Sequence, residues 1–186
     1  MIKSFKYITK NIAIIFMIAM FFSCGNQIQE VRDFLADKNL PIGVAENIKN
    51  IHTDSGRVDL KLYAPLLHDF TNRNKHPYNE FPEGVKIVTI DKNKDSLVVM
   101  GNYAISYTKT NISEIRNKVV VINYADYKKL LTDQLFWDQK TKYFYTEKPF
   151  TLITKTDTIK GVGFDASEDL KTFMAKQSKG SVYLND

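Results

Sequence analysis

The chain has 186 residues, 44% of them hydrophobic and 25% charged, with a formal net charge of +5 at pH 7. Three lysines and no acidic residue lie in the first 23 positions, so the rest of the chain holds 23 basic and 21 acidic residues. That balance, and the lack of a Lys/Arg cluster with interleaved aromatic residues, exclude a typical nucleic-acid-binding protein.

The N-terminal segment has the pattern of a secretory signal. Lys3, Lys6 and Lys10 precede an uncharged apolar run over residues 12–22. Such a run rises about 16 Å as a helix, whereas a membrane-spanning helix needs about 20 residues. We therefore expect a signal peptide over residues 1–23 rather than a stable transmembrane helix.

The single cysteine follows this run directly. Ser23 before Cys24 resembles the lipobox of bacterial lipoproteins, although Phe21 and Phe22 depart from the usual residues there. We predict that Cys24 is the lipidated first residue of the mature protein; an uncleaved signal anchor with a buried cysteine is the alternative. An acylated Cys24 leaves no thiol for a disulfide, so the remaining 163 residues depend on their hydrophobic core.

A tether over residues 24–45 is expected next. Ile28, Val31, Phe34 and Leu35 recur at helical spacing, which predicts a short helix that ends near residues 39–41.

Alternating apolar and polar residues dominate the chain from residue 46 onward and predict β-strands. A first hairpin is expected around the turn at residues 54–56, with its return strand at residues 57–64. Residues 69–82 read as a polar loop, and residues 167–173 as a helical turn. Further strands are predicted at residues 85–90, 97–107, 119–124, 131–137, 143–146, 150–155, 158–165 and 181–184. Strands at this spacing predict an all-β sandwich or jelly roll over residues 46–186.

A loosely repeated strand phrase recurs about every thirty residues in the second half of the chain. Its copies are Tyr103–Tyr107, Asp133–Trp137 and Gly161–Asp165.

Several segments in order resemble the LptC-like family, the periplasmic component of the lipopolysaccharide-export machine, in its Bacteroidota form. They are Thr53–Val58 with Leu62–Pro65, Glu80–Ile87, Thr132–Asp138 and Ile159–Phe164, within a likeness that covers about residues 46–175. The resemblance implies a single twisted, boat-shaped antiparallel β jelly roll with an open apolar groove.

The resemblance also implies a function. The groove would receive lipid A acyl chains of lipopolysaccharide from the inner-membrane ABC transporter and pass them to a periplasmic bridge protein of related fold. Two features depart from the family: a lipid at Cys24 replaces its spanning helix, and Asn117-Lys118 stands where a Gly-Asn turn is common. We expect a periplasmic protein anchored by lipid at the inner membrane.

Ten apolar side chains are expected to face the groove, although for each of them an ordinary place in a closed core is the simpler interpretation. They are Leu60, Leu62, Val99, Ile105, Val119, Val121, Leu135, Trp137, Leu152 and Phe164. By chain position and by analogy with the family, Ser181, Val182, Tyr183 and Leu184 are the candidate edge strand for the bridge protein.

The sequence carries no recognisable catalytic constellation. His52, His68 and His76 stand in or beside polar turns without metal-binding spacing, and Gly161-x-Gly163 is not followed by a phosphate-binding sequence. We therefore expect no enzyme activity, no cofactor and no metal. The alternative functions are a cell-envelope β-sandwich lipoprotein that binds glycan or protein, with a closed core and exposed aromatic residues on one outer face, and an independent lipid shuttle.

Overall fold

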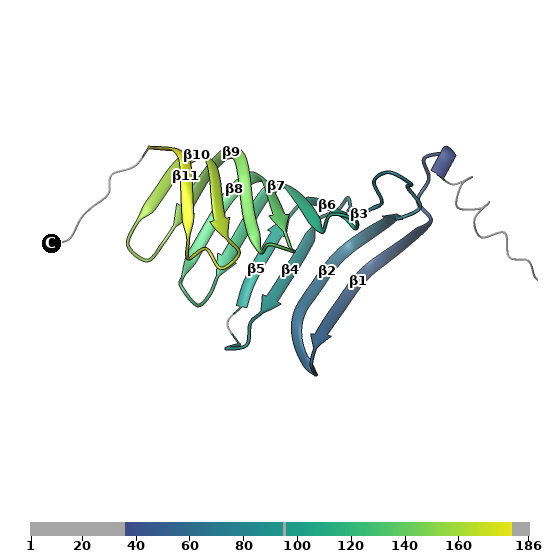
Figure 1. The fold of residues 1–186 in the computed structure, drawn as a ribbon, viewed down its shortest axis with the longest axis horizontal. Helices are drawn as coiled ribbons and strands as arrows, with labels where there is room; N and C mark the ends of the chain where they lie inside the picture. The colour runs from purple at the N-terminus through teal and green to yellow at the C-terminus, as the bar shows by residue number, and fades with distance from the viewer. Residues whose placement is uncertain (1–35, 95, 180–186) are drawn as a thin grey trace, which may run out of the picture. The chain divides into compact units, whose positions relative to one another are not determined.

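The computed structural model describes residues 36–94 and 96–179. The expected signal peptide, Cys24 and the candidate edge strand at Ser181–Leu184 lie outside the described residues. Residues Leu35–Asp186 form one compact unit. Its described part is built on a single antiparallel sheet of eleven strands, which confirms the predicted all-β jelly-roll class (Figure 1).

The strands follow one another along the chain with short connections. They are β1 (Gly43–Asp54), β2 (Arg57–Phe70), β3 (Tyr78–Phe81), β4 (Val85–Ile90), β5 (Ser96–Gly101), β6 (Tyr103–Tyr107), β7 (Ile112–Asn123), β8 (Lys128–Asp138), β9 (Tyr143–Ile153), β10 (Thr158–Ser167) and β11 (Phe173–Lys179). β3 and β4 together act as one bent strand, because both pair antiparallel with β2. β5 and β6 act as a second bent strand, because both pair antiparallel with β7. The sheet is therefore a meander in chain order from β1 to β11.

A line of irregularities crosses this meander, and we call it the fold line. It runs through residues 47, 65, 82–84, 102, 117–118, 133, 147–148 and 163, where the pairings skip or shift register. Gly84, Asn117, Lys118 and Gly163 adopt left-handed backbone there, with φ of 95°, 62°, 55° and 74°. Bulges bend strands, so the sheet folds over along this line.

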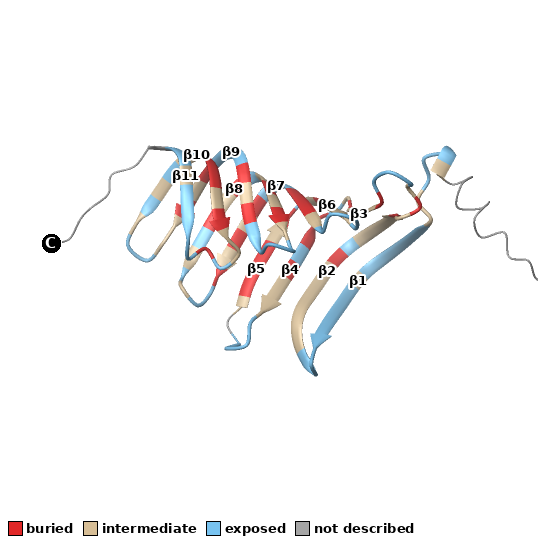
Figure 2. Cartoon of the chain, in the orientation of Figure 1, coloured by how far each residue is buried: buried red, intermediate tan, exposed pale blue. Residues whose placement is uncertain are grey.

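The fold line divides the sheet into two wings. Wing A contains β4, β5 and the adjoining halves of β2, β7, β8, β9 and β10, whereas wing B contains β3, β6 and the other halves of those strands. Buried side chains of both wings form one hydrophobic cluster. Figure 2 shows buried residues running through β5 to β10, whereas β1 is exposed along nearly its whole length.

Several predicted boundaries were wrong. The expected loop at residues 69–82 contains β3, and the expected helical turn at residues 167–173 is the connection to β11, a strand that was not predicted. The two strands expected at residues 143–146 and 150–155 are one strand, β9, bent at the fold line. The residues Asn117-Lys118, expected to depart from the common Gly-Asn turn, supply the bend of β7.

Candidate functional site: the apolar interior

The interior between the wings is lined by cross-strand ladders of apolar side chains. One ladder crosses wing A through directly paired residues from β2 to β10: Leu62, Ile87, Val99, Val121, Leu130, Leu152 and Ile159. Wing B contributes Phe81, Ala104, Ile115, Leu135, Trp137, Phe144 and Phe164. Since residues paired directly across an antiparallel sheet share one face, these side chains form a continuous apolar surface.

Most of the side chains expected to face the groove belong to this interior. Seven of them, Val99, Val119, Val121, Leu135, Trp137, Leu152 and Phe164, are at most 2% exposed. Leu60 and Leu62 are partly buried and pack against the same cluster.

Ile105 does not face the interior, and its prediction was wrong. Its neighbour Ala104 is buried in the core, and successive strand residues point to opposite faces. Ile105 pairs instead with Glu80 and Glu114 on the outer face of wing B.

The interior is closed in its middle and exposed at both ends of the sheet. At the β1–β2 end, Leu60, Leu62 and Leu67 are only partly buried. At the β11 end, Phe173 is 37% exposed and stacks on the fully buried Phe164, with ring centroids 5.9 Å apart. The apolar surface thus reaches both edges of the described sheet.

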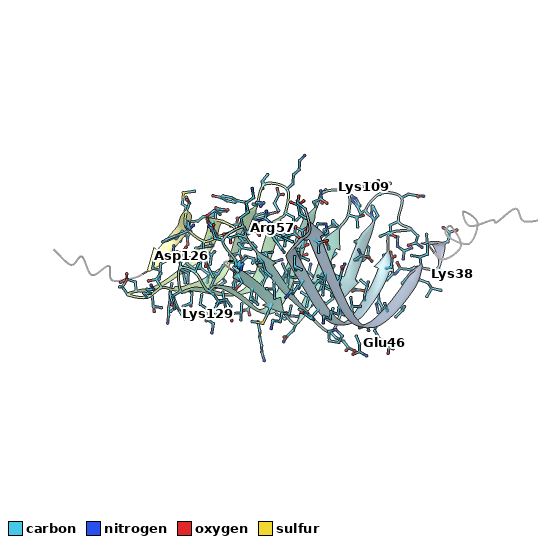
Figure 3. The ribbon with its side chains drawn as sticks, turned by 90° about the horizontal axis from the view of Figure 1, so that it is seen from below. Lys38, Glu46, Arg57, Lys109, Asp126 and Lys129 are labelled. Carbon is cyan, nitrogen blue, oxygen red and sulfur yellow. The ribbon has the colours of Figure 1, made fainter. Side chains whose placement is uncertain are left out.

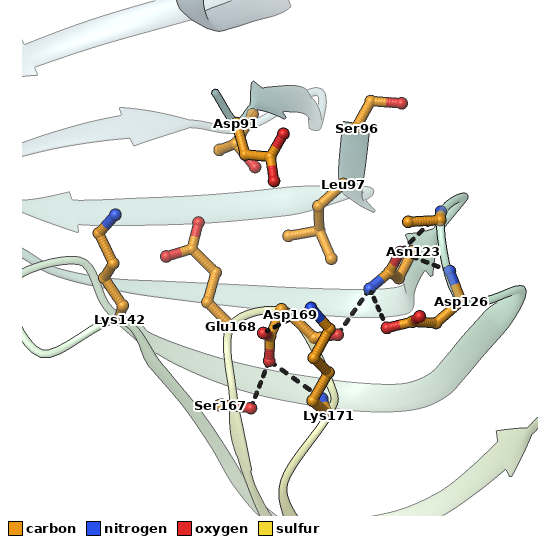
Figure 4. A pocket seen from close by; sticks show the side chains of 12 residues that line it. Asp91, Ser96, Leu97, Asn123, Asp126, Lys142, Ser167, Glu168, Asp169 and Lys171 are labelled. Atoms are coloured by element: carbon orange, nitrogen blue, oxygen red, sulfur yellow. Dashed lines mark hydrogen bonds and ion pairs between the residues drawn. The ribbon is translucent and has the colours of Figure 1, made fainter. Parts of the chain in front are cut away.

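The β10–β11 loop closes the mouth between the wing tips, and we call residues 168–172 the strap. Leu170 on the strap is fully buried in the core, although its φ of 56° is uncommon for a bulky residue. Asn123 Nδ2 donates to Asp169 O at 2.6 Å, and Lys128 Nζ donates to Leu170 O at 2.7 Å. Both donors belong to wing A, so these bonds tie the strap across the mouth. Figure 4 shows the bond from Asn123.

A pocket of about 320 Å³ lies beside the strap, between Thr89, Leu97 and Asn123 on one side and Lys142 and the strap on the other. Figure 4 shows Glu168 in this pocket with Lys142 near it. Burial raises the pKa of Glu168, and Lys142 only partly offsets this effect. The buried indole N–H of Trp137 points the pKa of Glu168 the other way, because it favours the ionised carboxylate. This N–H nevertheless forms no hydrogen bond with any described residue.

The outer face of wing B carries a polar cluster that sequence reasoning missed. Glu114 is 4% exposed and forms a bidentate pair with Arg116, at 2.7 Å and 2.6 Å, and also accepts a hydrogen bond from Gln134. Burial alone would raise the pKa of Glu114, but the bonds from Arg116 and Gln134 outweigh it and lower the pKa. Tyr103 donates to Glu80 at 2.7 Å; burial and this bond raise the pKa of Tyr103. No local sequence motif signals this cluster, because its residues come from four strands, β3, β6, β7 and β8.

Aromatic side chains surround that cluster. The rings of Phe136 and Tyr145 stack at 5.0 Å and lie beside a hollow of about 300 Å³ that Tyr107 and His76 also line. The other two histidines are paired in the structure: His52 with Asp59 at 2.7 Å and His68 with Glu80 at 3.4 Å. The described residues contain no group of three or more side chains suited to hold a metal ion.

Comparison with known families decides the identity of this fold. The family model described as "Lipopolysaccharide-assembly, LptC-related" matches residues 12–181, nearly the whole chain. The chain belongs to the LptC-related family. Membership gives this LptC-related chain a role in lipopolysaccharide transport in the cell envelope. No curated protein sequence matches it. Within the residues described, none of its helices has the length and apolar character to cross a membrane.

Proposed function

We propose that this protein is a non-catalytic carrier that shelters the acyl chains of lipopolysaccharide in its apolar interior. It receives them from the inner-membrane ABC transporter and passes them to a periplasmic bridge protein. The observation that supports this function is the continuous apolar surface from β2 to β11, exposed at both ends of the sheet.

The energetics favour such a surface. Burying one methylene group stabilises by about 0.8 kcal/mol, so a 14-carbon chain needs about 10 kcal/mol of shelter to cross water. The interior between the wings is lined by a continuous hydrophobic cluster that can supply this shelter. Because its middle is packed, acyl chains enter where Leu60, Leu62 and Leu67 are partly exposed, and the wings separate to admit them further.

The remaining parts of the function concern residues outside the described ones. We propose that Cys24 carries a lipid anchor in the inner membrane, facing the periplasm. We also propose that Ser181–Leu184 pairs with the bridge protein, because an unpaired strand offers free backbone N–H and C=O groups.

Competition binding tests the carrier function. The purified full chain is titrated with fluorescently labelled lipopolysaccharide, and unlabelled intact or deacylated lipopolysaccharide is the competitor. We expect only the intact form to compete, because the acyl chains make the contacts. Leu62→Gln removes an inward apolar side chain and should weaken binding about tenfold. Tyr63→Gln, on the outer face of the same strand, is the matched control and should leave binding unchanged.

A second candidate function is supported by the outer face of wing B. There the stacked Phe136 and Tyr145 adjoin the buried, hydrogen-bonded Glu114, an arrangement of flat rings beside polar groups that suits a sugar. In this reading the protein is an envelope lipoprotein that binds glycan through its surface. Equal competition by intact and deacylated lipopolysaccharide, with Leu62→Gln silent and Phe136→Ala defective, would establish this function instead of the carrier.

A further inference from the structure

The outer face of wing A is apolar at its centre. The residues before and after each member of the inward ladder point to the outer face of wing A. These outward residues also lie directly opposite one another on neighbouring strands. The central outward positions are Val88, Val98, Met100, Val120, Ile122, Leu131 and Ile153. At the margins of the face, Ile51 is 45% and Val162 is 43% exposed.

Lysines surround this apolar centre. Five lie on the outward positions themselves: Lys49, Lys61, Lys86, Lys129 and Lys160. None of the five forms an ion pair with another described residue. Three acids share the outward strand positions: Asp54, which lies opposite Arg57, Asp59, which is hydrogen-bonded to His52, and Asp133 at the fold line. The face is therefore cationic.

The outer face of wing B has the opposite character. Its outward strand positions include the carboxylates Glu80, Glu114, Asp138 and Asp165. Three of these are already paired within the described unit: Glu80 with Tyr103, Glu114 with Arg116 and Asp165 with Lys176. Figure 3 shows Lys129 of wing A and Lys109 beside wing B on opposite sides of the unit. Free positive charge on an apolar centre thus distinguishes wing A from wing B.

Exposed tyrosines extend the same face at the tip of wing A. Tyr124 and Tyr127, in the β7–β8 turn, are 56% and 66% exposed. The ammonium group of Lys155 lies 4.2 Å from the centre of the Tyr127 ring. Tyrosine and lysine are the residues that favour the boundary between a bilayer and water, because each combines an apolar body with a polar end.

We propose that the outer face of wing A docks on an anionic phospholipid bilayer. The half-buried central side chains, which exclude Val98 because it is only 6% exposed, contact the boundary of the acyl region, and the lysines contact the phosphate groups. Eleven residues separate Cys24 from Ala36, so a lipid at Cys24 keeps the unit within about 40 Å of that bilayer. Docking orients the unit with wing B and its acidic, aromatic face turned toward the periplasm.

Cross-linking of the full chain to lipid tests this orientation. A photoreactive amino acid replaces Ile122 on wing A or, as the matched control, Ile105 on wing B; both are half-buried, outward-facing isoleucines. The protein is reconstituted in vesicles of phosphatidylethanolamine and phosphatidylglycerol, or of phosphatidylcholine alone. We expect a lipid adduct at Ile122 in the anionic vesicles only, lost at high salt because screening shortens the reach of the lysines. No adduct at Ile122, or equal adducts at Ile122 and Ile105, would overturn the proposal.

Neutralisation of lysines provides a second measurement. The unit of residues 35–186 has its own core and can be studied without the N-terminal segment. Each lysine near an anionic surface contributes about fivefold to binding, so Lys86→Gln with Lys129→Gln should lower partitioning into phosphatidylglycerol vesicles about 25-fold. Lys75→Gln with Lys140→Gln, in loops at the tip of wing B, removes the same charge and should have little effect. An equal loss of partitioning for both double variants would mean that net charge alone attracts the protein to the vesicles. That result would contradict docking through the outer face of wing A.

The inference does not depend on the carrier function, because these vesicles contain no lipopolysaccharide. Failure of docking leaves the interior untouched, and failure of the interior to bind acyl chains leaves the docking result in place.

Discussion

At the scale of single residues, Leu170 holds the mouth of the interior closed. Its backbone adopts φ of 56°, and its side chain is fully buried between the wings. Burial of a leucine side chain stabilises by about 1.5–3 kcal/mol, which offsets the cost of roughly 1–2 kcal/mol for the left-handed backbone. The strap around it is fixed through its backbone carbonyls by Asn123 and Lys128, so its position depends on wing A.

Glu168 makes the stability of the closed mouth depend on pH. Burial raises its pKa above the ordinary value of 4.5, so the folded state binds this proton more tightly than the unfolded state. The stabilisation that comes from this tighter proton binding is therefore fully present below pH 4.5 and is lost as the pH rises through the raised pKa of Glu168. Glu168→Gln should increase the free energy of unfolding at pH 7 and leave it nearly unchanged near pH 4.

Urea denaturation of the wild type and of Glu168→Gln at both pH values checks this expectation. The neighbouring exposed Asp169 is a poor control because Ser167 and Lys171 bind it. Glu83→Gln on the fold line serves instead, because Glu83 is exposed and forms no ion pair with another described residue. An equal shift at both pH values would mean that packing, rather than ionisation, explains the effect of Glu168→Gln.

At the scale of elements, the fold line converts one sheet into two packed wings. Gly101 shows why small residues are needed there. A Cβ atom at Gly101 would lie 2.3 Å from Ile115 Cγ2 and 3.1 Å from Arg116 O. Ile115 is fully buried and cannot move aside, so the close approach of β5 and β7 requires glycine.

Gly101→Ala should therefore lower the free energy of unfolding by about 1–3 kcal/mol, the usual cost of overpacking. Asn102→Ala, at the next residue, keeps the backbone N–H that donates to Asn117 O at 2.9 Å and should change stability by less than about 0.5 kcal/mol. Thermal unfolding of both variants provides the comparison. A Gly101→Ala protein as stable as the wild type would show that β5 and β7 can separate at the fold line.

The fold line also explains which predictions from sequence succeeded. Alternation along single strands placed Leu62, Val99, Val121 and Leu152 correctly, because each lies in a segment without a bulge. The prediction that Ile105 points inward failed because the alternation of inward and outward residues shifts by one residue between Gly101 and Ala104. The sequence pattern does not reveal such a shift. The three copies of the repeated phrase all lie at this line, so the repeat reflects the bend rather than a separate motif.

β3 and β11 were the strands least predictable from sequence. β3 has only four residues, too few to show an alternating pattern, and β11 is polar over its second half. Pairing to neighbouring strands holds both in place. The strap was wrongly expected to be a helical turn. Its conformation depends on bonds from Asn123 and Lys128, which lie more than forty residues earlier in the chain. Contacts at that distance leave no local signal.

At the scale of the whole described unit, three surfaces have distinct chemistry. The interior is apolar and open at both ends, the outer face of wing A is apolar with free lysines, and the outer face of wing B is aromatic with paired carboxylates. A carrier beside a membrane needs such a division, because the surface that shelters acyl chains must stay separate from the surface that contacts the bilayer. The proposed docking and the proposed carrier function therefore occupy opposite faces of the same sheet.

Photo-cross-linking to lipopolysaccharide in cells tests the central claim most directly. A photoreactive amino acid replaces Leu62, at the open end of the interior, or Ile105, on the outer face of wing B. The account predicts a lipopolysaccharide adduct at Leu62 that disappears when cellular ATP is depleted, and none at Ile105. A correctly folded protein with no adduct at Leu62, or with equal adducts at both positions, would contradict it.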